Sequence, residues 1–221
     1  MGQTATALDL AAWGLSLPAR EEGGGDWHSG ASEISLARWL REAAQEVDQR
    51  DMVLLASREA FMESLALEDF RAAERLAGRA NWLELRETLL AALLAAPHAY
   101  ERIEILLEED MIDEAVVCID PLKGHYYCHG DRTLERLAER AYGDHPDWAI
   151  ALAFRMADPI MNDGRSAHYE TAAEWLAIAA RAHAASGRSE EWDRHLEGLI
   201  ETHRRKYTLR PLLEALRNTP F

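Results

Sequence analysis

Apolar residues recur at helical spacing along nearly the whole chain, and this periodicity limits the possible folds more than any other feature. In the segment NWLELRETLLAALLAA, spacings of three and four put one row of residues on the same side of a helix: Trp82, Leu85, Leu89 and Leu93. The segment EEWDRHLEGLIETHRRKY carries a similar row: Trp192, Leu196, Leu199, Ile200 and His203. Because the alternation typical of strands is nearly absent, the pattern predicts an all-α protein.

Glycine and proline divide this pattern into segments of helix length. The main breaks are Gly78, Pro97, Pro121 with Gly124, Gly143 with Pro146, Gly164 and Gly187. We expect helices at about 4–13, 33–48, 51–65, 68–78, 80–95, 98–109, 111–119, 131–142, 146–161, 166–186, 189–206 and 211–218. Residues 17–32, LPAREEGGGDWHSGAS, follow no such rhythm, and Trp27 is their one large apolar side chain. They form either a flexible, disordered insertion or a binding loop.

Three helix junctions resemble one another. A turn is expected at each of them, and each turn precedes small or aromatic residues that suit close helix packing. Ala115 follows the turn at Glu109-Asp110. Trp148, Ala149 and Ala151 follow the turn at Gly143, and Trp192 follows the turn at Gly187-Arg188. Such pairing is typical of tetratricopeptide-like arrays, although no clean period of about 34 residues survives. We therefore predict one domain, residues 1–221, folded as a degenerate tetratricopeptide-like solenoid, a right-handed α-α superhelix. A compact helical bundle is the alternative.

The chain is acidic, with a formal net charge of −15. This charge opposes non-specific binding to nucleic acid or to anionic membranes and favours a basic segment on a partner. Two cysteines are too few for a disulfide framework, and no apolar run reaches the length of a membrane span. Because the N-terminus also lacks a signal-peptide pattern, we expect a cytoplasmic protein that does not enter a membrane.

Two stretches carry a family resemblance: FMESLALEDFRAAERLAGRANWLELRETLLAAL (residues 61–93) and YETAAEWLAIAARAHAASGRSEEWDRHLEGLIETHRRKYTLRPLLEAL (residues 169–216). They resemble the helical, tetratricopeptide-like region that follows the finger in bacterial SWIM zinc-finger proteins, which often finishes in a run similar to HRRKYTLRPLL. The resemblance extends from about Ala7 onward. It implies the C-terminal part of a longer SWIM-type protein, or a homologue without the finger, and a context of DNA repair or recombination.

The finger itself has no counterpart in this chain. A SWIM finger needs C-x-C followed by C-x-H, and the sequence contains no C-x-C. The finger's zinc and its nucleic-acid role therefore cannot be assigned to any residue here. A separate zinc site is weakly indicated in CIDPLKGHYYCHGD, where Cys118, His125, Cys128 and His129 could act as ligands together with Asp131. Their spacing lacks the closely spaced ligand pairs, such as C-x2-C or H-x3-H, that are typical of small zinc sites. We therefore favour the interpretation that this stretch connects two repeats and binds no metal.

No enzyme motif is present. The sequence holds no P-loop, G-x-G-x-x-G, H-E-x-x-H or G-x-S-x-G pattern, and the adjacent Cys128 and His129 are poorly placed to form a nucleophile pair. We expect no catalytic residues and no cofactor. Six tryptophans lie at helical spacing from other apolar residues and are predicted to pack in the core: Trp13, Trp39, Trp82, Trp148, Trp175 and Trp192.

Basic residues concentrate in the C-terminal segment 204–210, which contains Arg204, Arg205, Lys206, Tyr207 and Arg210. We call it the basic segment. The first three cations are expected in the last turn of helix 189–206, where they would complement the helix dipole, and Pro211 is expected to open a closing helix. Intramolecular pairing, a protein-docking patch and contact with phosphate are three alternatives, in that order.

These observations favour a non-enzymatic scaffold for protein–protein interaction, with the basic segment as the candidate partner-binding site. A nucleic-acid-associated accessory protein and a small zinc-binding module are the alternatives.

Overall fold

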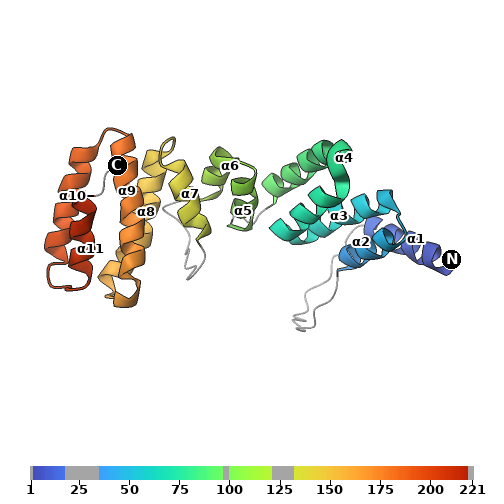
Figure 1. Ribbon diagram of the computed structural model, residues 1–221, viewed down its shortest axis with the longest axis horizontal. Helices are drawn as coiled ribbons and strands as arrows, with labels where there is room; N and C mark the ends of the chain where they lie inside the picture. The colour runs from blue at the N-terminus through green and yellow to red at the C-terminus, as the bar shows by residue number, and fades with distance from the viewer. Residues whose placement is uncertain (1, 18–34, 97–99, 121–131, 219–221) are drawn as a thin grey trace. The chain divides into compact units, whose positions relative to one another are not determined.

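The structure is a computed structural model, and it describes residues 2–17, 35–96, 100–120 and 132–218 (Figure 1). All regular elements in this part are helical, so the predicted all-α class is confirmed there. The chain forms two compact units, residues 1–105 and residues 106–221. No helix in the described ranges is both long and apolar enough to cross a bilayer. The predicted loop 17–32 lies outside these ranges except for Leu17.

The first unit contains four complete helices: α1 (Gly2–Ser16), α2 (Leu36–Glu46), α3 (Arg50–Ser64) and α4 (Leu67–Ala95). Helices α1, α2 and α3 share a small core formed by Leu8, Ala11, Leu40 and Ala56. Helix α5 (Tyr100–Glu108) begins in this unit and ends in the second. All five positions agree with the predicted segments to within a few residues, apart from the joining of 68–78 and 80–95 in α4.

Gly78 bends α4 sharply, so the break predicted at this glycine is confirmed. Its φ of +65° is a left-handed conformation that glycine adopts without steric cost. In a straight helix, Phe70 and Trp82 would lie about 18 Å apart. Their ring centroids are 5.2 Å apart in an edge-to-face contact, because the kink folds the second half of α4 back towards the first.

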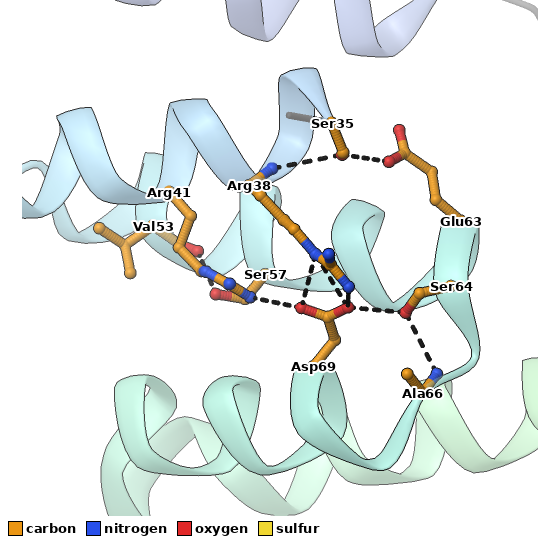
Figure 2. A network of polar contacts seen from close by, with 9 residues as sticks. All are labelled: Ser35, Arg38, Arg41, Val53, Ser57, Glu63, Ser64, Ala66 and Asp69. Carbon is orange, nitrogen blue, oxygen red and sulfur yellow. Dashed lines mark hydrogen bonds and ion pairs between the residues drawn. The ribbon is translucent and has the colours of Figure 1, made fainter. Parts of the chain in front are cut away.

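Asp69 joins three helices of the first unit (Figure 2). Asp69 is 0% exposed. Its carboxylate accepts hydrogen bonds from Arg38 (2.6 Å) and Arg41 (3.0 Å) of α2 and from Ser64 (2.7 Å) at the end of α3. Burial by itself would raise the pKa of Asp69, but the hydrogen bonds from Arg38, Ser64 and Arg41 hold the pKa below its usual value. A buried carboxylate is tolerated because its partners are all in place.

The second unit contains the end of α5 and six further α-helices: α6 (Ile112–Cys118), α7 (Thr133–Ala141), α8 (Pro146–Asn162), α9 (Tyr169–Ala185), α10 (Ser189–Thr202) and α11 (Leu209–Ala215). Short 3₁₀ turns, η1 (Ser166–His168) and η2 (Leu216–Asn218), precede α9 and follow α11. Helices α8 and α9 lie side by side over their length (Figure 1). Their facing sides are rich in fully buried alanines, among them Ala149, Ala153, Ala172 and Ala179.

The predicted turns between paired helices are present in this unit. Asp110, between α5 and α6, has a φ of +61°, and Gly187, between α9 and α10, has a φ of +72°. Of the small or aromatic residues expected behind the turns, Ala115 and Ala149 are 0% exposed and Trp192 is 3% exposed, while Trp148 and Ala151 are half-buried. The packing of neighbouring helices is thus confirmed, while the superhelix remains a prediction.

One contact recurs between successive helix pairs. Asp113, the second residue of α6, lies 2.6 Å from the ring of His145, which is the residue just before α8. Asp147, the second residue of α8, lies 2.6 Å from Arg188, which occupies the same position before α10. Both aspartates are more than four-fifths exposed, so each contact contributes little stability, but the two contacts join corresponding positions of successive helix pairs.

We predict that Asp69→Ala lowers the free energy of unfolding by about 3 kcal/mol or more, because it leaves Arg41 and Arg38 without their shared carboxylate. Chemical denaturation followed by circular dichroism measures this change. The neighbouring, exposed Glu68→Ala is the control and should cost no more than about 0.5 kcal/mol. Equal losses in the two variants would contradict a structural role for the Asp69 network.

Candidate functional site

The basic segment lies in the connection between α10 and α11. Helix α10 ends at Thr202, four residues earlier than predicted, so Arg204, Arg205 and Lys206 do not belong to its last turn. The helix stops because the backbone leaves the helical path at His203, whose carbonyl accepts a hydrogen bond from the Lys206 N–H (2.8 Å) in a tighter turn. Helix α11 then begins at Leu209, two residues before the predicted start at Pro211.

Lys206 fixes this connection to α8. Its Nζ donates a hydrogen bond to the backbone carbonyl of Met161, which lies in the last turn of α8. Carbonyls at a helix C-terminus lack intrahelical partners and form the negative end of the helix dipole, so a cation there is favourable. The dipole interaction predicted for this segment therefore exists for Lys206, but with α8 instead of α10.

Two of the arginines pair within the chain. Arg204 forms an ion pair with Glu201, and Arg210 forms one with Glu214 at 2.8 Å. Both pairs join exposed residues three or four positions apart in the chain, so each is worth only a few tenths of a kcal/mol. Arg205 is exposed and makes no ion pair or hydrogen bond with any residue in the described ranges. Tyr207 is 88% exposed.

A shallow hollow lies beside the segment. Its volume is about 430 Å³, and it is lined by Glu201, Thr202, His203, Arg204, Arg205 and Lys206. Three of these six side chains are permanent cations and one is a carboxylate, so the lining is mainly positive. The structure thus brings the predicted residues Arg204, Arg205 and Lys206 to one small surface, whereas their role in binding a partner remains a prediction.

Sequence reasoning missed a cluster of titratable groups between α8 and α10. The ring of His195 on α10 packs against Phe154 on α8, with ring centroids 4.3 Å apart. His203, at the end of α10, is only 5% exposed, and Asp158 on α8 interacts electrostatically with both histidines. The signal available in the sequence was the recurrence of His195, Leu199 and His203 on one side of α10, facing a helix that carries Asp158.

The environment shifts the pKa of all three groups. Burial raises the pKa of Asp158, and the two histidines partly oppose this rise. Burial lowers the pKa of His195 and of His203, and the nearby Lys206 lowers the pKa of His203 further, while Asp158 acts in the opposite direction on both. Both imidazoles are therefore favoured in their neutral form in the folded protein.

The zinc hypothesis rests mostly on residues outside the described ranges. His125, Cys128, His129 and Asp131 all lie there. Cys118, at the end of α6, is half-buried and carries a free thiol. Within the described ranges no group of three or more histidine, cysteine or acidic side chains is arranged to hold a metal ion.

The tryptophans do not all pack in the core as predicted. Trp175 and Trp192 are buried, and Trp82 and Trp148 are partly buried, but Trp13 is 61% exposed and Trp39 is 41% exposed. Helix α1 explains the error at Trp13: its charged residues are limited to Asp9, so apolar side chains surround the helix. One side, with Leu8 and Ala11, faces the core, and Trp13 lies on the other.

Comparison of the chain with protein-family models, with curated proteins and with solved structures finds no match. The resemblance to SWIM zinc-finger proteins therefore remains an expectation from the residues alone.

The lowered pKa values of His195 and His203 predict a loss of stability in acid. Below about pH 6.5 the unfolded chain binds protons that the folded protein does not, so the free energy of unfolding falls as the pH is lowered through this region. Asp158 has the opposite effect on stability. Because its pKa is raised in the folded protein, the folded protein binds a proton at this carboxyl more readily than the unfolded chain does. At pH values just above about 4, the free energy of unfolding therefore gains from Asp158 as the pH is lowered.

Denaturant unfolding measured at several pH values between about 5.5 and 7.5 tests this prediction. The double variant His195→Gln, His203→Gln should show a clearly weaker dependence of unfolding free energy on pH than the wild type. His168→Gln, which removes an exposed imidazole from η1, is the matched control. An unchanged dependence in the double variant would show that these two histidines do not carry the effect.

Proposed function

We propose that the protein is a non-enzymatic scaffold for protein–protein interaction, built from tetratricopeptide-like helix pairs. The similar contacts of Asp113 and Asp147 support a degenerate repeat architecture: these two residues are separated by about the length of one tetratricopeptide repeat, whereas their partners His145 and Arg188 are further apart in the sequence. Stacked helix pairs offer extended surfaces for partner segments without a dedicated active site. The resemblance to the helical region of SWIM proteins agrees with such a role.

An exposed apolar face on α1 and α2 carries the proposal. It consists of Leu10, Trp13 and Leu17, exposed by 61%, 61% and 49%, and of Leu36 and Trp39, exposed by 44% and 41%. The two helices meet within this face, because a Cβ at Gly14 would lie 3.5 Å from the side chain of Leu36. Soluble proteins seldom expose several large apolar side chains together unless another molecule covers them.

The surroundings of this apolar face indicate the chemistry of its partner. Asp9 lies one helical turn before Trp13, and Glu42 lies one turn after Trp39. Both are exposed, as is Glu46 further along α2. An apolar centre with an acidic rim is complementary to an amphipathic segment whose apolar side chains are flanked by Lys or Arg. Such a partner agrees with the expectation, drawn from the net negative charge of this chain, that the partner carries basic residues.

Capture of proteins from a lysate of the source cell, carried out both with and without nuclease, tests the proposal. The immobilised double variant Leu36→Ser, Trp39→Ser should retain at least about tenfold less of the partner than the wild type, as expected for the loss of two central apolar contacts. Leu83→Ser is the matched control, because Leu83 is 66% exposed on α4, outside the apolar face.

The retained partner should then bind the purified chain directly and saturably. Capture that disappears on nuclease treatment would favour the nucleic-acid-associated alternative. Capture that is the same for the double variant and the wild type would rule out the apolar face as the binding surface.

A further inference from the structure

The connection between α10 and α11, whose backbone path can be followed in Figure 1, is held in place at three points. His203 is 5% exposed at its start, Lys206 is bound to the Met161 carbonyl in its middle, and Leu209 is 0% exposed at its end. Backbone hydrogen bonds from Leu209 (3.1 Å) and Arg210 (2.9 Å) to the Lys206 carbonyl close the turn. A surface loop held in this way loses little conformational entropy when a partner binds.

Arg205 and Tyr207 are the side chains that these attachments leave available. Arg205 is exposed and unpaired within the described ranges, and Tyr207 is 88% exposed. Neither contributes to the packing of the second unit, so their exposure has no evident structural benefit. Arginine and tyrosine are among the residues that most often dominate the binding energy of protein interfaces, because both combine a polar group with a large planar surface.

The charge of the site distinguishes between kinds of partner. Arg204 and Arg210 are paired with Glu201 and Glu214, and Lys206 is bound to a carbonyl, so among the cations of the basic segment only Arg205 lacks a partner in the part of the chain that the structure describes. A nucleic-acid backbone needs several cations, and the net charge of −15 repels it. One guanidinium at the rim of a shallow hollow matches one carboxylate, which it can bind through two parallel hydrogen bonds.

From this arrangement we infer that the basic segment is a second docking surface, which binds an acidic peptide segment of a protein partner. Arg205 binds an Asp or Glu side chain of the segment, and Tyr207 packs against an aromatic or aliphatic residue beside it. The inference rests on the proposed scaffold function and adds a binding site in the second unit that differs in charge preference from the apolar face of the first.

Panning of a random ten-residue peptide library, displayed on phage, tests the inference with the full-length chain as bait. Parallel selections use three baits, the wild type, Arg205→Glu and the double variant Leu36→Ser, Trp39→Ser, and the peptides of interest are those enriched on the wild type but not on Arg205→Glu. The enriched peptides should contain Asp or Glu next to an aromatic or aliphatic residue, and a synthetic copy should lose about tenfold or more in affinity when that acid is replaced by its amide.

Matched variants separate the site from general charge effects. Arg194→Glu changes the same charge at an exposed position of α10 and should leave the affinity for the selected peptides within about twofold. Tyr207→Ala should weaken binding by about tenfold, as expected for an interface anchor. Equal losses for Arg194→Glu and Arg205→Glu would overturn the inference, because they would show an effect of net charge alone.

The outcomes also distinguish this inference from the proposed function. Peptides that bind Arg205→Glu as well as the wild type, but fail to bind the Leu36→Ser, Trp39→Ser variant, would refute the docking surface and leave the scaffold function intact. If no peptide is enriched on any of the three baits, both proposals fail. Enrichment without a preference for acidic residues would refute the docking surface.

Discussion

Close approach of helices through alanine is the constraint on which both units depend. In the first unit Ala37, Ala44, Ala56, Ala60 and Ala73 are almost fully buried, and in the second unit the contact between α8 and α9 uses the same residue type. An alanine face lets two backbones come near each other, but it buries little apolar area by itself. The larger buried side chains, mainly Leu, Ile, Phe and Trp, therefore supply most of the apolar area that each unit buries.

The sequence predicted helices well because their apolar rows depend on local spacing. The break at Gly78 and the turns at Asp110 and Gly187 could also be predicted, since each follows from the conformational needs of one short stretch. The end of α10 could not. The chain leaves the helical path at His203 and leads into the contact between Lys206 and a carbonyl of α8, and no local pattern encodes a contact between segments so distant in the chain.

In the candidate sites, too, features that depend on local sequence could be predicted and features that depend on contacts between distant segments could not. The sequence identified the basic segment, because the clustering of its charges is local. It also ranked intramolecular pairing of those charges first, but it did not name their partners. It did not reveal that Trp13 and Trp39 lie at the surface. At Trp13 the reason is that an apolar residue at helical spacing fits either side of a helix surrounded by such residues, as α1 is. Asp158, His195 and His203 meet only after α8 and α10 are placed next to each other.

The attachment of Lys206 to α8 couples two segments that are remote in the sequence. When the last turn of α8 frays, the Met161 carbonyl moves and the connection between α10 and α11 loses its middle support. Local opening of these two segments should therefore be cooperative, with similar protection of their amides against hydrogen exchange. Pro159 lies within this last stretch of α8 and removes a backbone donor there. The orientation of Arg205 and Tyr207 thus depends on the integrity of a helix that neither residue belongs to.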